Sequence, residues 1–179
     1  MKIKSLTIYC SSSNFLNKKY YDISKKIGAF LGEKNIKIIY GGGKAGIMGC
    51  ISKSAYKNGS KVIGIIPKFL EKKENINYNI TKTIIVNEMS RRKKLLFEKS
   101  DSILILPGGS GTIEEATEII SWKFLGIHNK PIIIFNYLNY WKELINLYKK
   151  SKNHNFGNKN LQSICIIVNN FKEFKEIFK

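Results

Sequence analysis

The chain has 179 residues, of which 43% are hydrophobic and 25% charged, and its formal net charge is +18. This length allows one domain with a substantial core, so we expect a single domain over residues 1–179. No apolar run approaches the length needed to cross a membrane. Lys4, Ser5 and Thr7 interrupt the apolar start, which is not typical of a signal peptide, and we expect a cytoplasmic protein.

The three cysteines are scattered, and they form no CxxC pair and no cluster with histidine. They therefore predict neither a disulfide framework nor a metal site. The lysines are spread along the whole chain, as a compositional bias would leave them. The alternative is a positive field that attracts phosphorylated ligands. No RNA- or DNA-binding motif accompanies the charge, so nucleic acid is not the expected partner.

Short apolar segments alternate with helical ones along the chain. The expected strands are Ile3–Cys10, Lys37–Tyr40, Lys61–Ile66, Thr83–Val86, Ser102–Leu106, Pro131–Phe135 and Ile164–Val168. The expected helices are Lys18–Lys34, a segment that follows Gly43 and ends near Asn58, Glu88–Lys99, Thr112–Leu125, Tyr140–Lys150 and Phe171–Phe178. Lys68–Asn79 is expected as a loop or short helix, and Ser151–Gln162 as a loop. Strands without polar alternation are buried on both faces, and this order predicts an α/β fold: a doubly wound, Rossmann-like, mostly parallel sheet flanked by helices.

Two glycine-rich segments follow predicted strands, where ligands bind in such sheets. The first, which includes Gly42 and Gly43, matches the G-x-G-x-x-G pattern of dinucleotide sites. The next strand ends in Pro67 without the acidic residue that binds an NAD ribose, so we do not expect NAD. The alternatives are a tight turn with close helix–sheet packing, or backbone N–H groups that approach an anionic ligand.

The second segment runs from Pro107 to Glu115 as P-G-G-S-G-T-I-E-E. Its glycines free the backbone to turn N–H groups toward one point, and Thr112 is expected to open a helix whose positive end faces that point. This combination predicts a phosphate site. Glu115 has two interpretations. It is either a ligand-facing carboxylate or the acidic partner of Thr112 in a capping box.

The helix expected after Val86 has a cation on its apolar side. At about 100° per residue, Met89, Arg92 and Leu96 share one face. An unpaired charge there is costly, so Arg92 needs an internal carboxylate, an anionic ligand, or a route for its head group to solvent. Arg92 and Glu115 both follow strands closely, and both can reach the carboxyl edge of the sheet.

Three motifs together resemble the Lonely Guy (LOG) family of cytokinin riboside 5′-monophosphate phosphoribohydrolases, often labelled lysine decarboxylase-like. They are P-G-G-x-G-T-x-x-E at Pro107–Glu115, M-x-x-R-K at Met89–Lys93, and Y-G-G-G-x-x-G-x-M-G at Tyr40–Gly49. The resemblance covers nearly the whole chain. It implies a Rossmann-like homodimer that hydrolyses N6-substituted AMP to the free base and ribose 5-phosphate, with no metal or organic cofactor.

The resemblance also implies roles for individual residues. Arg92 and Glu115 match the catalytic pair. The positions that match substrate-binding ones are Ser12, Gly42, Gly43, Glu74, Met89, Lys93, Gly108, Gly109, Ser110, Gly111 and Thr112. Ser90 and Ser110 depart from the family's usual residues beside the site, which bears on the base that is preferred. The alternatives are a general nucleoside 5′-monophosphate nucleosidase of salvage and a non-enzymatic carrier of a nucleotide or of the molybdenum cofactor.

Overall fold

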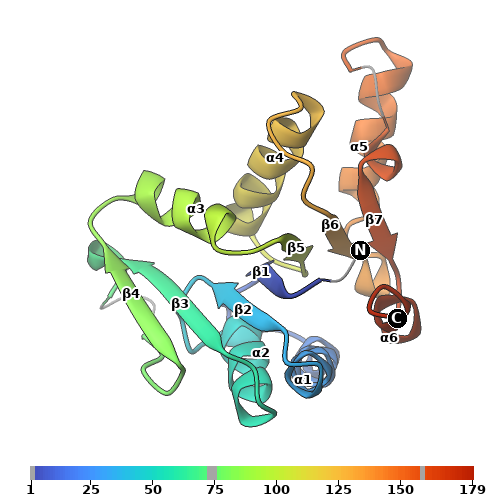
Figure 1. Cartoon of the computed structure of the whole chain (residues 1–179). Helices are drawn as coiled ribbons and strands as arrows, with labels where there is room; N and C mark the ends of the chain where they lie inside the picture. Colours follow the sequence, from blue (N-terminus) through green and yellow to red (C-terminus); the bar gives the residue numbers. More distant parts are fainter. Residues whose placement is uncertain (1–2, 72–75, 158–159) are drawn as a thin grey trace.

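The computed structural model describes residues 3–71, 76–157 and 160–179, and in these residues seven strands form one parallel sheet (Figure 1). The strand order is β4-β3-β2-β1-β5-β6-β7. The strands are β1 Ser5–Tyr9, β2 Lys37–Tyr40, β3 Val62–Pro67, β4 Lys82–Val86, β5 Ser102–Ile105, β6 Ile132–Phe135 and β7 Cys165–Val168. Each residue of β1, β5 and β6 is buried, as continuous apolar runs predict for central strands.

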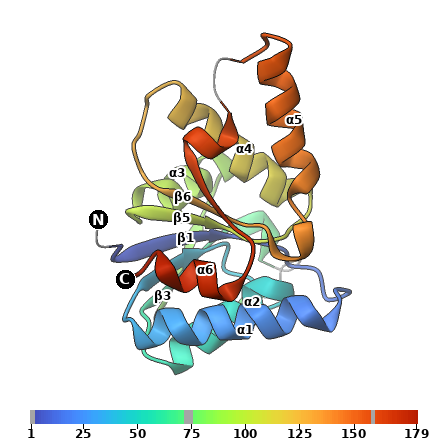
Figure 2. The ribbon, with the colours of Figure 1, turned by 90° about the vertical axis from the view of Figure 1, so that its right-hand side faces the viewer.

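Helices cover both faces of the sheet (Figure 2). The α-helices are α1 Lys18–Glu33, α2 Gly46–Lys57, α3 Met89–Glu98, α4 Ser110–Phe124, α5 Lys142–Asn153 and α6 Phe171–Glu176. Apolar side chains of α1, α2 and α6 pack into the core on one face. Those of α3, α4 and α5 pack into the core on the other. The doubly wound, mostly parallel sheet predicted from the sequence is therefore confirmed, with every strand pair parallel.

Three connecting segments contain 3-10 helices, and the first agrees with the loop or short helix expected over Lys68–Asn79. Within Lys68–Asn79 the described residues form a 3-10 helix, η1 (Lys68–Leu70), and an isolated bridge from Ile76 to Gly43. Two more 3-10 helices, η2 (Tyr137–Asn139) and η3 (Leu161–Ser163), lie on either side of α5.

The helix expected over Tyr140–Lys150 runs instead over Lys142–Asn153, so Ser151–Gln162 is not all loop. The backbone N–H of Trp141 donates to the side chain of Asn136 over 2.8 Å. The bond uses the backbone N–H of the residue just before α5, and it links that residue to Asn136, so the residues between them lie outside the helix.

The order of the strands determines where a ligand can bind. The chain leaves β1 in one direction, through β2 and β3 to β4, and then returns to the opposite side of β1 to form β5. The connections after β1 and after β5 therefore separate toward opposite faces of the sheet. A crevice opens at such a switch point, beyond the carboxyl ends of the two strands.

Gly28 of α1 provides a test of the packing between α1 and α2. A Cβ at Gly28 would lie 2.7 Å from the Ile51 carbonyl oxygen and 2.8 Å from the Ser54 Cβ. Helix propensity alone would favour alanine by about 1 kcal/mol. We expect Gly28→Ala instead to lower the free energy of unfolding by about 1–3 kcal/mol, because the two helices must separate. Urea denaturation measures this, with Lys26→Ala on the exposed side of α1 as the control. A raised midpoint for Gly28→Ala would contradict the close packing.

Candidate functional site

A cleft of ≈ 320 Å³ lies at the switch point of the sheet. Two of its walls are the segments that directly follow β1 and β5, and α2 and α3 contribute one side chain each. The lining residues are Cys10, Ser11, Ser12, Ser13, Met48, Arg92, Gly109, Ser110, Gly111, Thr112 and Glu115. The cleft therefore joins the two motif regions that the sequence analysis placed at this edge.

The first turn of α4 forms one wall of the cleft. The helical hydrogen bonds begin where the Ile113 N–H donates to the Gly109 oxygen over 3.0 Å, and Gly109 is the N-cap residue. The N–H groups ahead of Ile113 are therefore not used by the helix itself. They lie at its positive end, which is a suitable place for a phosphate.

This start of α4 corrects the predicted one. Thr112 was expected to open the helix, and it is instead the third residue of it. A capping box requires the threonine at the N-cap position, with the glutamate three residues later. Gly109 occupies that position and makes no side-chain cap, so the capping-box interpretation of Glu115 is wrong.

Arg92 and Glu115 meet inside the cleft. The Arg92 Nη2 and Glu115 Oε1 atoms are 3.8 Å apart, and the two side chains are only 7% and 10% exposed. Arg92 also directs Nη1 toward the Met89 sulfur at 3.5 Å. Its Nε is buried and has no hydrogen-bond partner among the described residues. The guanidinium is thus paired in charge with Glu115 but incompletely hydrogen-bonded, which is unusual for a buried arginine.

The environment of the pair keeps two nearby groups neutral. Burial, and then the negative charge of Glu115, raise the pKa of the Cys10 thiol. Burial raises the pKa of the Tyr9 phenol as well, with Glu115 as the next cause. A thiol with a raised pKa is a poor nucleophile. Cys10 therefore contributes to the shape of the cleft and not to covalent chemistry.

Backbone hydrogen bonds fix the wall that follows β1. The Ser11 N–H donates to the Pro107 oxygen over 3.1 Å, and the Met48 N–H donates to the Ser11 oxygen over 3.1 Å. The Gly46 N–H donates to the Asn14 side chain over 3.0 Å. The segments after β1, β2 and β5 are therefore tied to one another around the cleft.

Comparison with known proteins identifies relatives of this chain. Residues 48–177 match a family model described as possible lysine decarboxylase. The chain is 34% identical over 175 residues to a probable cytokinin riboside 5′-monophosphate phosphoribohydrolase of Oryza sativa subsp. japonica, covering 98% of this chain and 70% of the relative. It is 35% identical over 172 residues to a cytokinin riboside 5′-monophosphate phosphoribohydrolase of Arabidopsis thaliana, covering 96% and 81%. The chain belongs to the LOG family.

Solved structures with the same fold are more distant in sequence. The molybdenum cofactor carrier protein of Chlamydomonas reinhardtii superposes with a TM-score of 0.74 at 14% identity, over 99% of this chain and 96% of that one. The molybdenum cofactor binding protein of Rippkaea orientalis superposes with a TM-score of 0.70 at 18% identity, over 99% and 96%. At these identities the likeness is one of fold.

Most of the residues that the LOG resemblance singled out lie together. Ser12, Arg92, Gly109, Ser110, Gly111, Thr112 and Glu115 line the cleft. Gly108 lies against the Thr112 side chain, and the Met89 sulfur contacts Arg92. Cys10, Ser11, Ser13 and Met48 also line the cleft but were not predicted as site residues. The sequence could have indicated them, because three of them directly follow β1 and Met48 belongs to the Tyr40–Gly49 motif.

The remaining predicted residues do not line the cleft. Gly42 packs against Ile65 and Ile66 of β3, and Gly43 pairs with Ile76. The Lys93 Nζ lies 2.7 Å from Glu114 and 2.9 Å from Glu118, so Lys93 joins α3 to α4 on the outer side of these helices. Glu74 falls outside the described residues.

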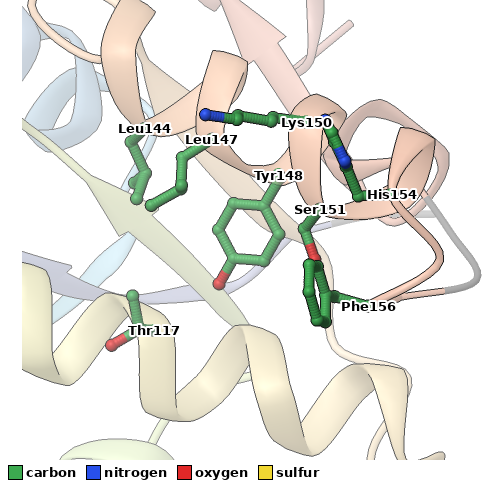
Figure 3. Close-up of a pocket in the computed structure, with 8 residues that line it drawn as sticks. All are labelled: Thr117, Leu144, Leu147, Tyr148, Lys150, Ser151, His154 and Phe156. Atoms are coloured by element: carbon green, nitrogen blue, oxygen red, sulfur yellow. The ribbon is translucent and has the colours of Figure 1, made fainter.

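A second, mainly apolar hollow of ≈ 520 Å³ lies between α4 and α5 (Figure 3). Its lining residues are Thr117, Leu144, Leu147, Tyr148, Lys150, Ser151, His154 and Phe156. The Tyr148 ring projects from α5 toward α4, and the Phe156 ring lies at one end of the hollow (Figure 3). None of these lining residues carries a carboxylate, so the hollow lacks the paired charges found in the cleft.

No group of three or more His, Cys, Asp or Glu side chains in residues 3–71, 76–157 and 160–179 is placed to hold a metal ion. In the same residues, no helix combines the length and the apolar character required to cross a bilayer.

Two neighbouring glycines test the loop that precedes α4. A Cβ at Gly108 would overlap the Thr112 hydroxyl and lie 2.6 Å from the Thr112 Cβ, whereas a Cβ at Gly109 would meet nothing within 4 Å. We expect Gly108→Ala to lower the free energy of unfolding by about 1–3 kcal/mol through overpacking, and Gly109→Ala to lower it less, by no more than about 1 kcal/mol, the cost of alanine at an N-cap. Thermal denaturation of the two variants measures the difference. Equal melting temperatures would contradict the observed contact between Gly108 and Thr112.

Proposed function

We propose that this LOG-family chain hydrolyses the N-glycosidic bond of a nucleoside 5′-monophosphate, with N6-substituted AMP as its substrate. The products are the free base and ribose 5-phosphate. The observation that carries the proposal is the buried pair of Arg92 and Glu115, 3.8 Å apart in a cleft beside the N-terminus of α4. The names of relatives at 34–35% identity support the same reaction.

The amino end of α4 binds the 5′-phosphate in this proposal. Its first N–H groups are available, and Gly109, Ser110 and Gly111 line the cleft with little or no side-chain bulk. Backbone amides at a helix N-terminus favour an anion without a positively charged side chain. The ribose then extends from this end of the cleft toward Arg92 and Glu115.

Glu115 acts at the reacting carbon. Cleavage breaks the bond from C1′ to the base nitrogen, and positive charge develops on the ribose as the bond lengthens. A carboxylate beside C1′ stabilises that charge, and it can orient or deprotonate the attacking water. The water oxygen forms the new bond to C1′, and the departing base receives a proton.

Arg92 contributes the complementary positive charge. Its buried, incompletely hydrogen-bonded guanidinium can donate to the ribose, to the phosphate or to the departing base. Each of these contacts would hold the substrate against Glu115. The reaction needs no metal ion or organic cofactor, because water and two charged side chains supply its chemistry.

We further propose that residues 1–179 act as one domain, that AMP itself binds in the cleft, and that the protein works as a cytoplasmic homodimer. The dimer and the location rest on the family resemblance. Light scattering coupled to size-exclusion chromatography tests the dimer directly, since its mass would be twice the 20.5 kDa of the chain.

The decisive test is AMP turnover by Glu115→Gln and Arg92→Ala, measured as released adenine. We expect each rate to fall by at least about 10²-fold, the usual scale for lost acid–base or electrostatic groups. Glu114→Gln and Arg91→Ala are matched controls, because these neighbouring residues are exposed and do not line the cleft. Both controls should retain wild-type rates. Full activity in Glu115→Gln would exclude Glu115 from the chemistry.

A substrate panel separates the proposal from its alternatives. AMP, CMP, GMP and isopentenyl-AMP are incubated with the wild-type protein, and the released base is measured. Preference for isopentenyl-AMP supports the cytokinin substrate, whereas similar rates on all four support a general salvage nucleosidase. Tight binding without release of any base would support a nucleotide or cofactor carrier.

A further inference from the structure

One hydrogen bond reaches the glycine loop from a distant part of the chain. The hydroxyl of Tyr140 donates to the carbonyl oxygen of Gly108 over 2.7 Å. Tyr140 lies between η2 and α5, beyond β6, and 32 residues separate it from Gly108. It is not among the residues that line the cleft. Any effect of this bond on a ligand therefore acts through the loop.

The bond determines how the peptide between Gly108 and Gly109 is oriented. In a planar trans peptide, the C=O and N–H groups point in opposite directions. When Tyr140 holds the Gly108 oxygen on one side, the Gly109 N–H is directed to the other. Gly108 is buried, whereas Gly109 is exposed and lines the cleft. The Tyr140 hydroxyl thus orients a backbone donor at the end of the cleft where α4 begins.

The backbone that carries Tyr140 is unusual. Leu138 and Asn139, the two residues before it, have φ values of 53° and 59°. The left-handed region is unfavourable for residues with a side chain, and for leucine it is rare. Strained conformations of this kind persist where the surrounding structure enforces them, and they concentrate at functional sites.

Asn136 enforces this conformation. Its backbone N–H donates to the Val168 oxygen over 2.7 Å, and its side-chain oxygen accepts from the Trp141 N–H over 2.8 Å. Its side-chain nitrogen donates to Asn169 over 3.0 Å. The Asn136 end of the segment from Asn136 to Trp141 is therefore fixed to β7 and to the residue after it, and the Trp141 end is bonded to Asn136.

Aromatic contacts fix the ring of Tyr140. The ring meets that of Tyr20 on α1 edge to face, with centroids 6.3 Å apart, and that of Trp141 with centroids 5.0 Å apart. Trp141 is 2% exposed. A ring held from two directions loses little further freedom when its hydroxyl forms the bond to Gly108.

We propose that Tyr140 is a positioning residue for the phosphate end of the cleft, acting through the Gly108–Gly109 peptide. The proposal rests on the function proposed above and adds a requirement to it. Phosphate affinity depends on a hydroxyl outside the cleft, at the end of a strained segment. A hydroxyl that only stabilised the fold would affect every ligand equally or none.

The test compares Tyr140→Phe with Tyr137→Phe. Both variants remove one hydroxyl from the same segment, and Tyr137 packs its ring on Phe135 and Tyr20. Calorimetry measures the affinities for ribose 5-phosphate, which carries the phosphate, and for adenosine, which lacks it. Steady-state kinetics with AMP give KM and kcat. Melting temperatures of both variants report on the fold.

For Tyr140→Phe we expect the ribose 5-phosphate dissociation constant and the KM for AMP each to rise about 3- to 10-fold, the usual effect of one lost hydrogen bond. The adenosine affinity should not change, and Tyr137→Phe should match the wild type in every measurement. A second variant, Asn136→Ala, removes the side-chain bonds that hold the segment from Asn136 to Trp141. It should weaken the binding of ribose 5-phosphate more than the binding of adenosine.

The inference is overturned if Tyr140→Phe has the same ligand affinities and KM as Tyr137→Phe, or if its affinities for ribose 5-phosphate and adenosine fall equally. In either case a wild type that cleaves AMP leaves the proposed function intact. A wild type that binds no ribose 5-phosphate and cleaves neither AMP nor isopentenyl-AMP removes the proposed function, and this inference with it. The wild-type measurements therefore separate the two failures.

Discussion

A guanidinium and a carboxylate buried together link the two halves of this molecule. Arg92 comes from the helix that follows β4 and Glu115 from the helix that follows β5, and each would be costly to bury alone. At 3.8 Å the two groups form an ion pair in which each offsets the charge of the other. The fold therefore maintains a polar gap at the place where its strand order reverses. A structure under selection for stability alone would fill such a gap with apolar side chains.

The fold could be predicted from the sequence because its strands are continuous apolar runs. Ile103–Ile105 and Ile132–Phe135 cannot be half-exposed, so they required helices on both faces of the sheet, as observed. The position of Arg92 on the apolar side of its helix could be predicted too. It shares a helix face with Leu96, and these two are the buried residues of α3. The spacing of apolar residues along a helix predicts which of its faces is buried, and that spacing can be read from the local sequence.

The features that escaped prediction depend on contacts between distant residues. Local sequence favoured Thr112 as the start of α4, whereas the close approach of Gly108 to the Thr112 side chain accompanies a helix that begins at Ser110. The bond from Tyr140 to Gly108 spans 32 residues and has no local pattern. The ion pairs of Lys93 with two glutamates of α4 were not predicted either, because they join two different helices.

The main-chain amides at the start of α4 have a consequence for the surface of the protein. In the proposed function, the anion is recognised by the path of the backbone, and exposed lysines far from the loop do not set that path. The chain can then accumulate lysine over its exterior, to a net charge of +18, without gaining or losing the chemistry of the cleft. Relatives whose exteriors are acidic should hold their ligand at the same loop. A phosphate site made of backbone amides would therefore let the composition of the surface change while the site itself stays the same.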